Sequence, residues 1–171
     1  MPSRYARAIA LHRQGQLDTA LREIDALIAL TPKSPWFHEL KGQVNYEAGR
    51  AANGLAAYKK SVELAPDQPL LLIGLATTQL SIAETGGEMS RNFNLAAEKN
   101  LRKALRLDPA NTTAYFQLSK AFGQMQRVAY AEWALAEYYA LLGRPESLKH
   151  ARRAIKGLPD GSPEKIRTTD I

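Results

Sequence analysis

The sequence predicts an all-α protein built as a solenoid, a superhelix of stacked helix pairs. A phrase that ends in proline recurs at Pro32, Pro66 and Pro109, and the first two prolines lie 34 residues apart, a period typical of two-helix repeats. Small residues also recur at two fixed positions before these prolines. Paired helices can cross closely only where side chains are small, so the two observations together predict about four helix-turn-helix copies.

The small residues keep one register through all four copies. They are Ala8, Gly42, Ala76 and Ser119 in the first helices and Ala20, Gly54, Ala97 and Ala131 in the second helices. We expect larger apolar residues to fill the seams between helices, namely Leu21, Ile24, Ile28, Leu55, Tyr58, Val62, Leu101, Leu105 and Leu135. The alternative is a bundle of unrelated amphipathic helices, in which four copies in register would be a coincidence.

Composition agrees with one ordinary globular domain over residues 1–171. The chain is 45% hydrophobic and 23% charged, and its net charge of +6 is spread along most of its length, as on a solvated surface. It has no cysteine, so it can form neither a disulfide nor a thiolate metal site. No run approaches the roughly 18 apolar residues of a membrane span, and no signal-peptide core follows the first residues.

The predicted repeats are residues 1–34, 35–68, 69–111 and 112–144. Ser34 and Pro35 mark a helix start, because a capping hydroxyl precedes a proline at the first helical position. The third copy carries about nine extra residues relative to the 34-residue period. We place them in a loop around Thr85–Arg91, since glycine pairs mark loops and solenoid insertions lengthen them.

A capping helix is predicted at residues 145–157, followed by a tail at 158–171 with a short helix that packs back on the cap. The apolar stripe of the cap is Leu148, Ala151, Ala154 and Ile155, and its polar outer face is Lys149, Arg152, Arg153 and Lys156. A terminal repeat needs such a polar face, because no neighbour covers it. The alternative is that the four cations contact an anionic partner or a membrane surface peripherally.

Motifs for chemistry are missing from the sequence. His38 and Glu39 begin like the HExxH zinc motif, but Gly42 stands where its second histidine would be. No phosphate-binding glycine loop or Gly-x-Ser-x-Gly elbow is present. We therefore predict no catalytic residue, no metal and no cofactor in this chain, and no nucleic-acid partner.

The first helices of a solenoid line a concave groove that binds partners. Positions five, nine and twelve of each copy share that face: Tyr5, Ile9, His12, Glu39, Gln43, Tyr46, Ile73, Thr77, Leu80, Phe116 and Lys120. This mixed aromatic and apolar lining suits an extended or helical polypeptide segment with apolar anchors. The alternative is that a neighbouring helix or the tail buries several of these residues.

The register of small residues and prolines resembles the tetratricopeptide repeat (TPR) family. The best-matching stretch is Gly15-Gln16-Leu17-Asp18-Thr19-Ala20-Leu21. In TPR chaperone adaptors, by this resemblance, lysines and asparagines at matching positions clamp the terminal carboxylate of a peptide. Tyr5, Ile9 and Gln43 depart from that pattern, so a different binding mode is expected.

Longer phrases resemble the C-terminal TPR domain of bacterial zinc metalloproteases of the BepA type. They are Gly42-Gln43 with Tyr46-Glu47-Ala48-Gly49-Arg50, then Leu64-Ala65-Pro66-Asp67-Gln68-Pro69-Leu70, and the ending Leu158-Pro159-Asp160-Gly161-Ser162-Pro163-Glu164 through Arg167 to Asp170-Ile171. Lys165 stands where that family usually has a tryptophan.

The resemblance implies a periplasmic, membrane-associated protease in outer-membrane protein quality control. Its HExxH domain and zinc would lie upstream of this chain, and the TPR half would recruit partners or substrates. The alternative is a free-standing scaffold or assembly factor without a protease, for which a cytoplasmic location is the default.

Overall fold

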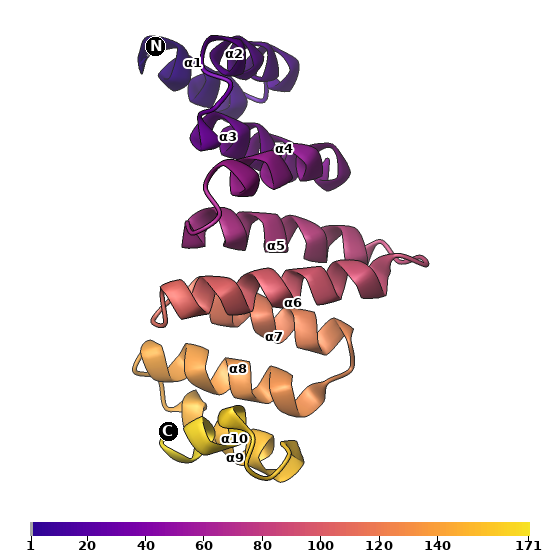
Figure 1. Cartoon of the computed structure of the whole chain (residues 1–171), viewed down its shortest axis with the longest axis vertical. Coiled ribbons are helices and arrows are strands. Elements are labelled where there is room, and N and C mark those ends of the chain that lie inside the picture. The colour runs from indigo at the N-terminus through magenta and orange to yellow at the C-terminus, as the bar shows by residue number, and fades with distance from the viewer. Residues whose placement is uncertain (1) are drawn as a thin grey trace. The chain divides into compact units, whose positions relative to one another are not determined.

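The computed structural model describes residues 2–171, and within that range it contains ten helices and no strand (Figure 1). The all-α prediction is therefore confirmed. The helices are α1 (Pro2–Arg13), α2 (Leu17–Leu30), α3 (Pro35–Glu47), α4 (Ala51–Leu64), α5 (Pro69–Glu84), α6 (Ser90–Leu107), α7 (Thr112–Gln124), α8 (Val128–Leu141), α9 (Glu146–Gly157) and α10 (Pro163–Thr169).

The chain divides into two compact units, residues 1–78 and residues 79–171, and the boundary falls within α5. In the first unit α1 packs on α2, α2 on α3 and α3 on α4; in the second, α6 packs on α7, α7 on α8 and α8 on α9. Each unit therefore stacks consecutive helices, as a solenoid does. The organisation as one domain stays a prediction.

Two backbone hydrogen bonds close the turn inside a helix pair. In the second pair, the Gly49 N–H donates to the Tyr46 carbonyl at 2.9 Å, and the Arg50 N–H donates to the Asn45 carbonyl at 2.8 Å. Gly49 has a φ of +73°, which glycine adopts without steric cost. Gln126 holds the corresponding position in the fourth pair with a φ of +58°, although its Cβ makes this conformation unfavourable.

The core of the first unit lies between α1, α2 and α3. Ala8, Ile24, Leu40 and Val44 are buried there, and four partly buried residues pack against them: Ile9, Leu17, Leu21 and Ile28. All nine predicted seam residues of the chain are buried or half-buried. The apolar side chains therefore lie where the register of the repeats places them.

Small residues bring the helices of the first unit close together around one ring. Tyr58 is only 5% exposed. A Cβ added to Gly42 would lie 2.5 Å from Tyr58 Cδ2, and one added to Gly74 would lie 2.5 Å from Tyr58 Cε1. A Cβ added to Gly54 would lie 2.8 Å from the Gly42 carbonyl oxygen. No side chain fits at these three positions without displacing a neighbour.

Aromatic rings and arginines hold the helices of the second unit together. Phe122 and Trp133 are buried, and the Arg102 guanidinium lies 5.6 and 5.7 Å from their ring centroids. The Arg127 guanidinium lies 4.7 Å from the Phe122 centroid. Glu98 accepts from both arginines, at 2.9 Å from Arg102 and 2.8 Å from Arg127. These contacts combine cation–π attraction with ion pairing that is shielded from solvent.

The third copy places its extra residues differently from the prediction. Helix α5 has 16 residues against 13 in α3 and α7, and α6 has 18 residues against 14 in α2, α4 and α8. Only residues 85–89 form the loop. The prediction of a purely loop insertion is therefore wrong, because residues from Ser90 onward continue the helical hydrogen bonding of α6. This helix begins about one turn earlier than the other second helices.

The capping helix α9 buries a face rotated from the predicted stripe. Ser147, Ala151 and Ala154 are buried, as is Leu158 directly after the helix, whereas Leu148 is 49% exposed. Including Leu148 in the buried stripe was therefore wrong. Residues at i, i+4 and i+7 share one face of a helix, and the face that starts at Ser147 carries smaller side chains, so it can approach α8 more closely than a face with Leu148 could.

The tail helix α10 contacts α9, as predicted, and also contacts α8. Glu164 accepts from Arg102 of α6 at 2.9 Å, and Arg167 pairs with Glu137, a buried carboxylate of α8. Lys165 binds Asp160 at 2.6 Å and the Leu158 carbonyl at 3.3 Å, so this lysine stabilises the turn that leads into α10.

We expect Gly42→Ala to destabilise the protein by about 1–3 kcal/mol, because the new methyl group would overlap the Tyr58 ring. Urea unfolding followed by circular dichroism measures this. Gly123→Ala is the matched control: Gly123 lies in α7 with open space around it, so the same change should stabilise by about 0.5–1 kcal/mol. Equal effects at both glycines would contradict the close packing at Gly42.

We expect Arg167→Gln to weaken docking of α10 by about 1–2 kcal/mol, because it leaves the buried Glu137 carboxylate without its cation. Hydrogen exchange of the amides of residues 164–169 should then speed up. The double variant with Glu137→Gln removes the unpaired charge and should recover most of the protection. If the double variant exchanges as fast as Arg167→Gln alone, the ion pair is not what docks the tail.

Candidate functional site

Five predicted groove residues line one cavity of about 230 Å³ in the first unit. Glu39, Gln43 and Tyr46 come from α3, and Ile73 and Thr77 come from α5. The residues on α3 follow i, i+4 and i+7 spacing, which places them on one helix face. The structure therefore brings together the central part of the predicted groove.

Four further residues line the same cavity: Glu47, Tyr58, Leu70 and Gly74. They were not predicted as groove residues, because they do not occupy positions five, nine or twelve of a repeat. Tyr58 was predicted as a seam residue, and its ring is also the one enclosed between Gly42 and Gly74. The i+4 relation of Glu47 to Gln43 is the sequence signal that could have identified it.

Glu47 is held as an ionised carboxylate at the edge of the cavity. His12 Nε2 donates to its Oε2 at 2.7 Å, and Gln43 Nε2 donates to its Oε1 at 2.8 Å. The pKa of Glu47 is lowered below its usual 4.5, chiefly by the hydrogen bond from His12. The predicted groove residue His12 therefore does not line the cavity itself but orients one of its lining side chains, Glu47.

The second carboxylate of the cavity, Glu39, behaves in the opposite way. Its pKa is raised above 4.5, first by burial and then by the negative charge of Glu47. Burial likewise raises the pKa of Tyr58. The nine lining residues include two acids and no lysine or arginine, so the cavity attracts a cation or a hydrogen-bond donor and disfavours a carboxylate.

The predicted groove residues of α1 lie apart from this cavity. Tyr5 and Ile9 line a separate hollow of about 510 Å³ together with other residues of α1 and the turn after it. The Tyr5 ring lies 6.3 Å from that of Phe37, and Ile9 packs on the core of the first unit. Neither residue lines the cavity at Glu39 and Tyr46.

In the second unit the predicted groove residues divide into buried and exposed ones. Leu80 is 1% exposed, so its assignment to an open groove is wrong. Helix α5 has no charged residue before Glu84, and most of its apolar side chains, Leu80 among them, are buried. Phe116 is 42% exposed and lies 5.4 Å from the Tyr138 ring, and Lys120 pairs with Glu84 at 3.7 Å. The tail helix forms its ion pairs to α6 and α8 with Arg102 and Glu137.

All four cations of the cap face, Lys149, Arg152, Arg153 and Lys156, are exposed on α9. Arg153 pairs with Glu132 at 3.3 Å, and His150 Nδ1 lies 2.6 Å from the same carboxylate. Glu132 therefore offsets part of the positive charge of this face. Contact of the four cations with an anionic partner stays a prediction.

Metal centres and membrane spans are two further kinds of feature that a helical chain can carry. In residues 2–171 no three His, Asp or Glu side chains converge as a metal ion would require. No helix of the described chain combines the length and the hydropathy needed to cross a membrane.

Glu39 makes stability depend on pH in a defined direction. Because its pKa is raised in the folded state, the stability contribution of this group falls as pH rises from 4.5 through the raised pKa. We expect Glu39→Gln to raise the Tm by about 1–3 °C at pH 7 and to change it little at pH 4. Differential scanning calorimetry at the two pH values measures this.

Glu47→Gln is the matched control for Glu39→Gln. The pKa of Glu47 is lowered, so its contribution is present above pH 4.5 and is lost as pH falls through the lowered pKa. This variant should therefore lower the Tm at pH 7. If both variants shifted the Tm in the same direction at pH 7, the assignment of opposite environments would be wrong.

Comparison with known proteins agrees with the helix pairs. Residues 5–69 match the sequence profile of the tetratricopeptide repeat family, and no curated protein sequence matches the chain. Among solved structures, the chain is similar to TTC0263, a thermophilic TPR protein of Thermus thermophilus, with 16% identity, a TM-score of 0.64, and coverage of 99% of this chain and 97% of that one.

Two further structures share the fold. MamA from Desulfovibrio magneticus RS-1 is 17% identical with a TM-score of 0.70, covering 97% of this chain and 84% of that chain. YrrB, described as a TPR protein with an unusual peptide-binding site, is 17% identical with a TM-score of 0.58, covering 98% of this chain and 91% of that chain. The chain thus has the tetratricopeptide repeat fold, and its residues 5–69 match that family in sequence.

Proposed function

We propose that this protein is an interaction module that binds a polypeptide segment at the cavity between Glu39, Tyr46 and Thr77. The observation that carries the proposal is the convergence of five groove residues from α3 and α5 on one cavity. The similarity of fold to YrrB, which has a peptide-binding site by its description, supports a peptide as the kind of ligand.

The chemistry of the cavity indicates what the segment carries. Glu47 accepts two hydrogen bonds, and Glu39 lines the same cavity about two helical turns away, so a lysine or arginine side chain would find a charge partner. Leu70, which is 60% exposed, offers an apolar contact on the α5 side, whereas Ile73 lines the cavity but is only 6% exposed. We therefore propose a basic residue flanked by apolar residues, and not a terminal carboxylate.

For the wider context, we propose that the chain is the non-catalytic half of a periplasmic zinc-dependent protease in outer-membrane protein quality control. The phrases from Tyr46 to Arg50 and from Leu158 to Glu164 that resemble the BepA type support this proposal. Zinc and the HExxH motif would then belong to a domain upstream, and this chain would bind without cutting.

A free-standing scaffold or assembly factor accounts equally well for the fold and for the cavity. An open reading frame that encodes HExxH upstream of Met1 would favour the protease, and its absence would favour the scaffold.

Incubation of the purified chain with an unfolded outer-membrane protein, with and without zinc, tests the non-catalytic role. Zinc-dependent cleavage by this chain alone would refute it.

We expect Tyr46→Ala to weaken binding of a blocked, fluorescent Gly-Leu-Lys-Leu-Gly peptide about tenfold, because a half-buried aromatic contact at the cavity is lost. Fluorescence anisotropy measures this, and helical circular dichroism should stay unchanged. Tyr139→Ala is the matched control, since Tyr139 is half-buried on α8 and lies outside the cavity. A peptide with glutamate in place of lysine that bound as tightly would contradict the acidic cavity.

A further inference from the structure

A cavity of about 370 Å³ lies in the second unit where residues of α6, α7, α8 and α10 come together. Three arginines line it, Arg102 and Arg106 of α6 and Arg167 of α10, whereas Glu164 is the single acid of its lining. None of the three arginines was among the predicted site residues. A cavity with three guanidinium groups and one carboxylate attracts an anion.

The carboxylate of this cavity is already paired with one of the arginines. Arg102 Nη1 donates to Glu164 Oε1 at 2.9 Å, and Arg102 Nε donates to Glu98 Oε1 at 2.9 Å. The Arg102 guanidinium also lies 5.7 Å from the centroid of the Trp133 ring. Its side chain is therefore held on several sides, and the positive charge that is left in the cavity belongs to the other two arginines.

Those two arginines keep donors available for a ligand. Arg106 is exposed and forms no ion pair among the described residues. Arg167 contacts Glu137 through Nε and is 50% exposed, so its two terminal nitrogens are without an ion pair in the described chain. Its guanidinium lies 5.8 Å from the centroid of the Tyr115 ring, a cation–π contact that helps to fix its position. A guanidinium fork matches the geometry of a carboxylate.

Apolar side chains complete the accessible lining. Leu105 is half-buried and Pro163 is exposed, and both line the cavity. Tyr115 and Trp133 are only 2% and 6% exposed, so these two rings support the arginines and offer almost no surface to a ligand. Burial raises the pKa of Tyr115 to about 12, so its hydroxyl adds no negative charge at neutral pH. A ligand would therefore meet cations beside apolar contacts.

The tail helix shows which kind of ligand this lining accepts. Helix α10 is itself a polypeptide segment, and its Glu164 binds Arg102 while its Pro163 lines the cavity. A second acidic segment would extend this interface along α6 from Arg106. Arg106 also lines an adjoining hollow of about 280 Å³ together with Lys99, an exposed lysine without an ion pair among the described residues.

We propose that an acidic segment of a partner polypeptide docks in this cavity beside the tail helix. An aspartate or glutamate of the segment would accept from Arg106 and Arg167, and a neighbouring apolar residue would contact Leu105 and Pro163. The site goes beyond the proposed function, because it lies in residues 79–171 and takes a segment of the opposite charge.

The test uses ¹H–¹⁵N NMR on the full chain, with acetyl-Gly-Leu-Asp-Gly-amide as the probe at millimolar concentration. The two tryptophans are Trp36 and Trp133, and only Trp133 lines the cavity. We expect saturable shifts of the Trp133 indole N–H and of the backbone amides of Arg106 and Arg167, with the Trp36 indole unchanged. Acetyl-Gly-Leu-Asn-Gly-amide should bind about tenfold more weakly, because it lacks the charge.

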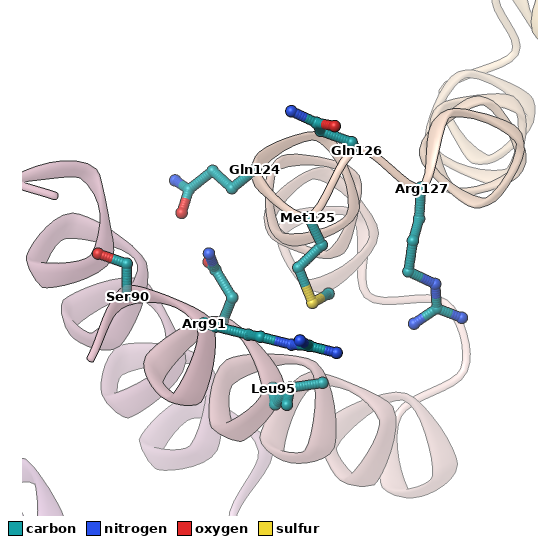
Figure 2. Close-up of a pocket in the computed structure, with 8 residues that line it drawn as sticks. Ser90, Arg91, Leu95, Gln124, Met125, Gln126 and Arg127 are labelled. Atoms are coloured by element: carbon teal, nitrogen blue, oxygen red, sulfur yellow. The ribbon is translucent and has the colours of Figure 1, made fainter. Parts of the chain in front are cut away.

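Arg106→Gln should weaken the aspartate peptide about fivefold, whereas Arg91→Gln should change its affinity by less than about twofold. Arg91 is a matched control, because it is an exposed cation of the same helix that lines a separate cavity of about 590 Å³ at the start of α6 (Figure 2). Tyr46→Ala should leave binding intact, which distinguishes this site from the cavity at Glu39.

Any of four results would overturn the proposal. The first two are the absence of a saturable shift at Trp133 and equal binding of the aspartate and asparagine peptides. The third is an equal effect of Arg106→Gln and Arg91→Gln, and the fourth is tighter binding of an oligothymidylate at the same signals, which would make the ligand a nucleic acid. If the aspartate peptide binds as expected while the basic peptide fails at the Glu39 cavity, the proposed function falls and this site stands.

Discussion

The close packing of Tyr58 between Gly42 and Gly74 is the constraint on which the first unit depends. A methyl group at either glycine would lie 2.5 Å from the ring, so the backbones of α3 and α5 can reach Tyr58 only because both positions lack a side chain. The same ring lines the cavity between α3 and α5. The residues that let the helices pack are therefore also those that give the candidate site its shape.

The cavity of about 230 Å³ in the first unit and the cavity of about 590 Å³ lined by Ser90, Arg91 and residues 124–127 in the second unit carry opposite charges. The first presents Glu39 and Glu47, and the hydrogen bond from His12 lowers the pKa of Glu47; the second presents Arg91 at a helix start without a side-chain cap. Both units are built from the same kind of helix pair. The difference in charge between their cavities arises from a few substitutions and from the insertion in the third repeat. A solenoid can thus acquire a new surface locally, because each repeat contacts only its neighbours.

The tail shows how charge can replace apolar packing at the end of a solenoid. Helix α10 has seven residues, too few to be stable alone, and Ile166 is exposed. Its docking relies on Glu164 with Arg102 and on Arg167 with Glu137. Such partly buried pairs are specific in geometry because each charge needs its partner to offset desolvation.

The sequence by itself determined the helix pairs and the face of α3 that carries Glu39, Gln43 and Tyr46, because proline position and residue spacing act locally. Only the tertiary structure decided that Leu80 is buried, that the insertion lengthens α6, and that His12 holds Glu47 across 35 residues. Spacing states which residues share a helix face. Which neighbour covers that face depends on packing between distant segments, and that packing leaves no periodic signal in the sequence.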